Sequence, residues 1–157
     1  MFRGQRMEVP AAGTNEKRCV YGATNYRTGQ VHYLVNPRKN GEQFNLFLRQ
    51  LVEAYKGRRV ILVLDNASYH RTLSTLELLS EYADRVFIVW LPTYSPELNL
   101  IEGLWGYLKR SGLNNYFFGD VATMETAIDE VFADLNQHPE TTLSLSYKSS
   151  RNLGETA

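Results

Sequence analysis

The chain has 157 residues, of which 43% are hydrophobic, and this length and composition predict one domain with a single core. Its only cysteine, Cys19, excludes an internal disulfide and a cysteine-rich zinc site. The sequence has no basic-then-apolar leader and no apolar run near the ~18 residues of a spanning helix, so we expect a cytoplasmic protein without membrane contact.

The formal net charge is zero, but the charges are separated along the chain. Residues 1–59 hold eleven Lys or Arg against four Glu, whereas residues 97–140 hold eight acids against Lys109 and Arg110. A surface polarised in this way attracts a polyanion on its basic side. Solvated charge without any partner explains the same pattern equally well.

The first predicted element is a β-hairpin. Residues 18–26 and 31–35 are rich in Tyr and Val and flank a turn at residues 27–30. After a loop, apolar residues keep a helical period from Phe44 to Tyr55, and the next Gly suits the position just past a helix.

Two buried strands are predicted next. Residues 59–64 and 85–91 are continuous apolar runs, as expected of strands covered on both faces, and residues 73–82 between them have helical spacing. This unit predicts a parallel pair joined by a right-handed crossover.

Two further helices are predicted. A turn-rich loop at residues 92–99 leads into a helix that ends near Arg110, and a loop at 114–119 precedes an amphipathic helix at 121–135. We assign residues 1–137 to the domain and expect residues 138–157 to form a polar, frayed tail.

Two carboxylates stand out by their positions. Asp65 follows the first buried strand, and Glu102 lies on the helix that comes after the second. Because the carboxyl ends of parallel strands meet at one sheet edge, these acids can converge although 36 residues separate them. An acid pair of this kind can share divalent metal ions for cutting phosphodiester bonds. Taken alone, Asp65 also fits a turn or helix cap, and Glu102 also fits a solvated helix face.

Five neighbours are candidate substrate contacts. Asn66 and Asn99 each lie close to an acid, and both are also ordinary turn residues. His70 fits a metal ligand, a phosphate contact or a cap of the next helix. Lys109 and Arg110 follow Glu102 by about two helical turns, where cations can hold phosphates.

Two segments carry a family resemblance. Residues 64–70 (LDNASYH) and 91–105 (LPTYSPELNLIEGLW) resemble the second-Asp motif and the final-Glu motif of mariner-type DDE transposases, in their bacterial insertion-sequence branch. Residues 21–25, followed by Thr28 and Gly29, are similar to the second-strand region and hairpin of that family. The resemblance spans about residues 3–137 and implies a ribonuclease-H-like α/β fold, the integrase and transposase catalytic core.

The resemblance also implies chemistry. Asp65 and Glu102 match catalytic, metal-binding acids, and the intact family site has three acids and two Mg²⁺ or Mn²⁺ ions. An intact member is a nucleoid-associated endonuclease that cleaves DNA at transposon ends and joins it to a target during transposition. Asn66, His70, Asn99, Lys109 and Arg110 are then candidate DNA contacts.

The chain departs from the family at its front. The first Asp of the family lies on the central strand, just before a stretch like residues 2–6, but no Asp precedes Asp65 here. Glu8, the nearest acid, falls in the following segment. Leu100 also replaces a Pro that the family commonly has. We therefore expect an N-terminally truncated catalytic domain that lacks its first central strand and is inactive alone.

The expected gap has three possible solutions. The N-terminal residues slide into the central position, two copies share their sheet edges, or an N-terminal transposase fragment completes the sheet. The predicted partners are thus DNA together with a second copy or such a fragment. Two alternative functions stay open: a non-catalytic fragment that binds DNA or transposase and modulates transposition, and an unrelated small α/β phosphoesterase, which the lack of a Gly-rich phosphate loop disfavours.

Overall fold

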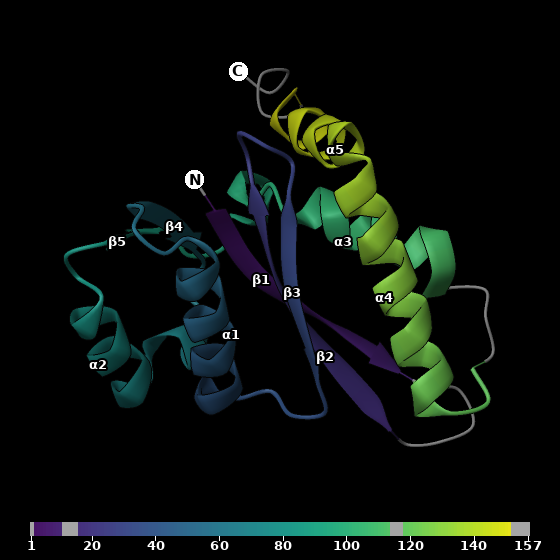
Figure 1. The fold of residues 1–157 in the computed structure, drawn as a ribbon, viewed down its shortest axis with the longest axis horizontal. Helices are drawn as coiled ribbons and strands as arrows, with labels where there is room; N and C mark the ends of the chain where they lie inside the picture. The colour runs from purple at the N-terminus through teal and green to yellow at the C-terminus, as the bar shows by residue number, and fades with distance from the viewer. Residues whose placement is uncertain (1, 11–15, 114–117, 152–157) are drawn as a thin grey trace.

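The computed structural model describes residues 2–10, 16–113 and 118–151. Five strands form one mixed sheet in the spatial order β3-β2-β1-β4-β5 (Figure 1). The antiparallel hairpin and the parallel pair joined by a helix, both predicted from the sequence, are confirmed. The strands are β1 Phe2–Pro10, β2 Lys17–Asn25, β3 Val31–Asn36, β4 Val60–Leu64 and β5 Val86–Trp90.

The prediction that the first central strand is missing is wrong. β1 occupies the centre of the sheet, where it runs antiparallel to β2 over its whole length and parallel to β4 through Phe2, Arg3 and Gly4. The N-terminal residues thus take the central position, as in the first of the three expected solutions. Pairing with β2 along its whole length and with β4 through its first three residues holds β1 in place, which an apolar pattern alone does not reveal.

One face of the sheet is covered by α1 (Gly41–Ala54) and α2 (Leu73–Glu81). The Asn40 side chain caps α1 by accepting a hydrogen bond of 2.9 Å from the Gln43 N–H, which satisfies one of the unpaired donors of the first turn. A buried cluster joins this face to β4, and its members include Tyr21, Phe44, Phe47, Leu48, Leu51, Leu62 and Leu64. The strand that ends at Asp65 therefore stands on a packed support.

The opposite face over β1–β3 is covered by α3 (Glu102–Leu108) and α4 (Val121–Gln137). A Cβ atom at Gly22 of β2 would lie only 2.5 Å from the Trp105 ring, so the missing side chain lets the indole of α3 lie directly on the sheet. On α4, the Asn136 side chain bonds both the N–H and the C=O of Val31, at 2.8 and 3.0 Å. Figure 1 shows strands β1–β3 lying between α1 on the left and α4 on the right.

The predicted frayed tail is also wrong for the residues that the structure describes. Pro139–Arg151 form α5, which contacts α3 and α4. The buried positions of this helix include Thr142 and Ser146, and the Ser146 hydroxyl donates 3.0 Å to the Thr142 carbonyl of its own helix. The Ser146 hydroxyl is thus satisfied by its own helix backbone, whereas the Thr142 hydroxyl has no hydrogen-bond partner among the described residues. Residues 152–157 lie outside the described ranges.

The strand β5 differs from the predicted strand covered on both faces. It forms one edge of the sheet, and Phe87 and Val89 are each 47% exposed, beside Ile61 of β4 at 45%. These three side chains occupy the face away from α1 and α2, which the other helices cover only over β1–β3.

None of the helices in residues 2–10, 16–113 and 118–151 has the length and apolar character that a membrane crossing requires.

Candidate active site

Asp65 is the first residue after β4 and leaves the sheet at its carboxyl edge. Its Oδ1 accepts a hydrogen bond from the Ala67 N–H at 3.0 Å, and the His70 Nδ1 lies 2.9 Å from the same oxygen. The first bond makes Asp65 a turn residue, as one sequence interpretation predicted, but the side chain still has 33% exposure. The turn therefore orients the carboxylate and leaves it reachable from solvent.

His70 lies directly beneath this carboxylate, in the 3₁₀ turn Ser68–Arg71. The residue is fully buried, and its ring lies 4.4 Å from the Phe44 ring and 4.3 Å from the Tyr69 ring. Its Nδ1 faces two Asp65 oxygens, the carboxylate at 2.9 Å and the backbone carbonyl at 3.1 Å, so Nδ1 is the nitrogen that carries a proton. This placement favours a role in orienting Asp65 over the predicted contact with DNA.

Glu102 reaches the same place from the other strand. The Leu91 N–H bonds the Leu64 carbonyl at 2.8 Å, so the loop after β5 starts beside the end of β4, and Glu102 begins α3 at the end of that loop. Asp65 and Glu102 line one hollow of about 490 Å³. Burial raises the pKa of Glu102, the charge of Lys109 opposes this, and the charge of Asp65 raises it further. The two predicted acids thus converge closely enough to repel each other.

Asn99 lines the hollow between the two acids and is only 3% exposed. Neither its Oδ1 nor its Nδ2 has a hydrogen-bond partner among the described residues. A buried polar group without a partner costs roughly 1–3 kcal/mol, so native proteins rarely keep one without a reason. The amide is therefore available to a ligand or water in the hollow.

Asn66 has a different environment from Asn99. Its Nδ2 donates 2.6 Å to the Leu91 carbonyl, and its Oδ1 accepts 2.5 Å from an Arg71 guanidinium nitrogen. The same guanidinium lies 4.1 Å from the centre of the Trp90 ring. Asn66 therefore ties the end of β4 to the loop after β5. Sequence reasoning did not single out Arg71, because its place depends on residues distant in the chain.

Lys109 and Arg110 continue α3 as a π-helical turn, Lys109–Leu113, and both are exposed. The charge of Lys109 lowers the pKa of Glu102 and so opposes the effect of burial. A Cβ atom at Gly106 would lie 3.0 Å from a terminal nitrogen of Arg110, so this glycine gives the guanidinium room along the helix. Both cations stand on the helix that carries one of the acids, where a phosphate can reach them.

The donors of the hollow fit one divalent ion. Two carboxylates, completed by waters and substrate oxygens, are a usual protein contribution to an Mg²⁺ site. Within the described ranges no group of three or more His, Cys, Asp or Glu is placed to share an ion. The central strand adds no acid at this edge, because Gly4 pairs with Leu64, the next residue is Gln5, and Glu8 lies further along, opposite Cys19 of β2. The donors present do not fit the two-ion site of the intact family.

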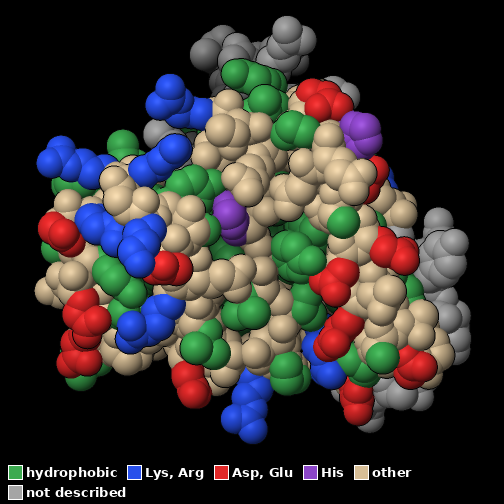
Figure 2. Space-filling model, in the orientation of Figure 1, with side chains coloured by type: hydrophobic (Ala, Val, Ile, Leu, Met, Phe, Trp, Pro, Cys, Tyr) green, Lys and Arg blue, Asp and Glu red, His purple; other side chains and the backbone are tan. Residues whose placement is uncertain are grey.

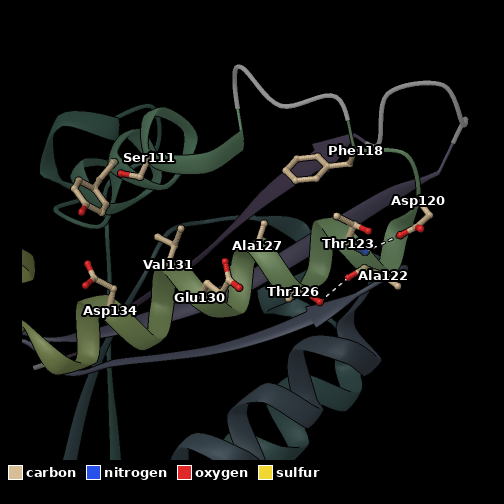
Figure 3. Close-up of a pocket in the computed structure, with 11 residues that line it drawn as sticks. Ser111, Phe118, Asp120, Ala122, Thr123, Thr126, Ala127, Glu130, Val131 and Asp134 are labelled. Carbon is tan, nitrogen blue, oxygen red and sulfur yellow. Dashed lines mark hydrogen bonds between the residues drawn. The ribbon is translucent and has the colours of Figure 1, made fainter.

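A larger hollow of about 760 Å³ lies elsewhere, between α4 and the segment that follows α3 (Figure 3). Its acids Asp120, Glu130 and Asp134 are spread along α4 and do not point to one centre in Figure 3. Asp120 caps the helix instead, since its Oδ1 accepts 2.7 Å from the Thr123 N–H, and this bond lowers the pKa of Asp120. This hollow therefore lacks the convergent acids of the site at the sheet edge.

Comparison with known proteins identifies the family. Residues 1–125 match the family described as DDE superfamily endonuclease. The chain belongs to this family. It is 31% identical over 116 residues to the Insertion element IS630 uncharacterized 39 kDa protein of Shigella sonnei, a match that covers 73% of this chain and 34% of that relative. The chain thus spans about a third of the length of this relative.

Solved structures establish the fold. The catalytic domain of Mos1 mariner transposase matches with a TM-score of 0.70 and 16% identity, over 96% of this chain and 80% of that chain. The Mos1 mariner paired end complex with Mn matches with a TM-score of 0.69 and 16% identity, over 94% of this chain and 53% of that chain. The predicted ribonuclease-H-like fold and the resemblance to mariner-type, insertion-sequence DDE transposases are confirmed.

Proposed function

We propose that this DDE endonuclease domain is the catalytic part of a transposase, which in a complete protein cleaves DNA strands and transfers them to a target. The observation that carries this proposal is the convergence of Asp65 and Glu102, from two neighbouring strand ends, on one hollow. A divalent ion bound there would activate the attacking oxygen and stabilise the leaving oxygen of a phosphodiester.

The residues of the chain have separate tasks in this proposal. Asp65 and Glu102 hold one Mg²⁺ or Mn²⁺ ion, and His70 keeps the Asp65 carboxylate oriented toward it. Asn99 offers its unpaired amide to a ligand of the hollow, whereas Lys109 and Arg110 receive DNA phosphates. The Mn-bound, paired end complex of the fold neighbour Mos1 agrees with both the metal and the DNA of this proposal.

We further infer that the chain does not cleave DNA alone. With only two acids at the site, the charge of two metal ions is not neutralised, and the second ion lacks a bridging ligand. A third carboxylate can be supplied by a partner, either a second copy or a separate transposase fragment. The alternative is a non-catalytic chain that modulates transposition by joining mixed assemblies.

The test combines metal binding with DNA nicking. We expect calorimetric titration to give one Mn²⁺ per chain, with binding lost in Asp65→Asn and Glu102→Gln and kept in Glu77→Gln, an exposed acid on α2. Supercoiled plasmid should stay intact with the chain and Mg²⁺. Metal binding that survives both site substitutions would contradict the proposed site, and Mg²⁺-dependent nicking that both abolish would contradict the inferred inactivity.

A further inference from the structure

A second hollow with an unusual charge lies at the other end of β4. It measures about 590 Å³ and lies where β4 begins, beside the end of β2. Among the described residues that line it, three of seven are arginines and none is an acid. The lining is formed by Asn25, Arg27, Thr28, Tyr55, Arg58, Arg59 and Ile61.

Ordered turns present these arginines. The Asn25 Oδ1 accepts hydrogen bonds from the Arg27 and Thr28 N–H groups, at 3.0 and 3.3 Å, which fixes the turn after β2. On the other side, Gly57 has a φ of +75°, a conformation that favours glycine, and turns the chain from α1 toward β4. The Arg58 N–H then bonds the Tyr55 carbonyl at 3.0 Å. The hollow is therefore formed by defined backbone.

The positive charge of the hollow is not neutralised locally. Within the described part of the chain, Arg27, Arg58 and Arg59 take part in none of the ion pairs, and the nearby Lys56 is paired with Glu53 at 3.4 Å. Arg85 adds a further positive charge beside the hollow. Its guanidinium donates a hydrogen bond of 3.3 Å to the carbonyl of Tyr55, which is one of the lining residues. Figure 2 shows most of the Lys and Arg side chains of this face on its left, where acids are mixed among them, whereas acids predominate on its right.

The two hollows are related by the geometry of β4. Arg59 precedes this strand and Asp65 follows it, so about 20 Å separates them at roughly 3.3 Å per residue. The exposed side chains of Ile61, Phe87 and Val89 lie on the uncovered face between the two ends. Phosphates of one DNA strand are about 3.4 Å apart along the axis, so the separation corresponds to about six nucleotides.

We propose that Arg27, Arg58 and Arg59 form a second phosphate-binding site, which holds the DNA backbone about six nucleotides from the phosphate at Asp65 and Glu102. The guanidinium is suited to this ligand because its planar N–H groups match phosphate oxygens in pairs. The six-nucleotide spacing rests on the proposed function, because it assumes that the DNA passes Asp65 and Glu102. The phosphate contacts themselves need no metal and no cleavage.

The test measures the salt dependence of DNA binding in EDTA, by fluorescence anisotropy with a 24-base-pair duplex. Each lost phosphate contact lowers the slope of log K against log salt by about 0.9, so the triple variant Arg27→Ala, Arg58→Ala, Arg59→Ala should lose about two to three. A matched variant, Arg38→Ala, Lys39→Ala, Arg49→Ala, removes the same charge from other exposed positions and should keep most of the slope.

Other outcomes overturn the proposal. Equal losses in both triple variants would mean that only net charge matters, and an unchanged slope would mean that the hollow does not contact DNA. A third arm adds inorganic phosphate at constant ionic strength, and selective displacement of DNA from wild type would identify a site for free phosphate instead. The triple variant Arg27→Ala, Arg58→Ala, Arg59→Ala should keep the wild-type Mn²⁺ affinity, so loss of this site and loss of metal binding are distinguished.

Discussion

The Asp65 carboxylate owes its orientation to a histidine that the solvent cannot reach. The His70 Nδ1 lies 2.9 Å from this carboxylate and bonds the Asp65 backbone carbonyl at 3.1 Å, and the Nε2 on the far side of the imidazole has no hydrogen-bond partner within the described residues. A buried group behind a metal-binding acid typically changes metal affinity 10- to 100-fold when removed. His70 is therefore a positioning residue in the proposed site.

Replacing His70 tests this role directly. We expect His70→Ala to lower Mn²⁺ affinity 10- to 100-fold and to cost about 1–3 kcal/mol of unfolding free energy, because a buried ring and its hydrogen bond are lost. His70→Asn keeps a nearby donor and should recover part of the affinity. Titration calorimetry and urea unfolding measure both quantities. His138→Ala, at an exposed histidine, should change neither, and wild-type metal affinity in His70→Ala would refute the positioning role.

Asn99 and Asn66 provide a matched pair for the second prediction. Asn99→Leu removes two buried polar atoms that lack partners, so we expect a gain of about 1 kcal/mol without ligand, together with weaker Mn²⁺ or DNA binding. Asn66→Leu instead breaks the bonds to Leu91 and Arg71 and should cost about 1–2 kcal/mol. Thermal unfolding measures both variants. A loss of stability in Asn99→Leu as large as that in Asn66→Leu would show that the Asn99 amide already has hydrogen-bond partners in the free protein.

At the scale of elements, α3 places Glu102 because a glycine lets it approach the sheet. The Trp105 ring lies against Gly22 of β2, and its burial fixes how α3 crosses the strands. An added methyl group at Gly22 must push the indole away, since 2.5 Å is far inside van der Waals contact.

Gly22→Ala should therefore destabilise the domain by about 1–3 kcal/mol and weaken metal binding through the displacement of Glu102. The control is Gly119→Ala, because a Cβ atom there meets nothing within 4 Å. Chemical denaturation measures the free energy of unfolding, and Mn²⁺ titration measures the loss of metal affinity that a displaced Glu102 would cause. If Gly22→Ala matches the control in both, the close packing of α3 on β2 does not hold in solution.

The elements that the sequence predicted share one property, an apolar pattern matched to their period. The runs that became β4 and β5 and the stripe of α1 are of this kind, and the crossover rule then brought Asp65 to Glu102. The segment of β1 reads Phe-Arg-Gly-Gln-Arg at its start and has no such pattern, since its stability as a strand comes from pairing on both edges. Likewise, the buried Thr142 of α5 looks polar in the sequence.

Side-chain geometry was the part of the site least open to sequence reasoning. Asn66 and Asn99 have the same residue type and the same closeness to an acid, yet one is fully bonded and the other has no partner among the described residues. The difference depends on where Leu91 and Arg71 come to lie, which no local pattern specifies.

At the scale of the whole molecule, the fold converts a charge difference along the chain into a difference between two sides. Figure 2 shows mainly acids over α4, whereas the opposite side carries most of the basic side chains mixed with acids. Arg18 of β2 pairs with Glu125 of α4, so part of the basic charge of the front half is neutralised where these two elements meet. The arginines at the start of β4 keep their charge toward solvent, which orients a polyanion toward the β4–β5 side.

The stability of the whole domain should also report the cost of ionising Glu102, which comes first from its burial and then from the charge of Asp65. The pKa of Glu102 is raised above its ordinary value of 4.5 in the folded state, so ionisation of Glu102 opposes folding. The penalty is complete at pH values above the raised pKa and disappears as the pH falls to about 4.5, where folded and unfolded chains are both protonated. We therefore expect Glu102→Gln to be more stable than wild type at pH 7 without metal, and equally stable near pH 4.

A saturating divalent ion should reverse this order at pH 7. The ion offsets the repulsion and binds only the folded wild type, which gains about 2.7 kcal/mol at a hundredfold excess over Kd, whereas Glu102→Gln gains little. Urea unfolding at pH 4 and 7, with EDTA or Mn²⁺, measures all four conditions. Glu130→Gln on α4 serves as the control acid, because it lies outside the hollow and should respond to metal like wild type. If Glu102→Gln were stabilised by Mn²⁺ as much as wild type, Glu102 would not be a ligand, and the acid pair would be a source of repulsion without a metal site.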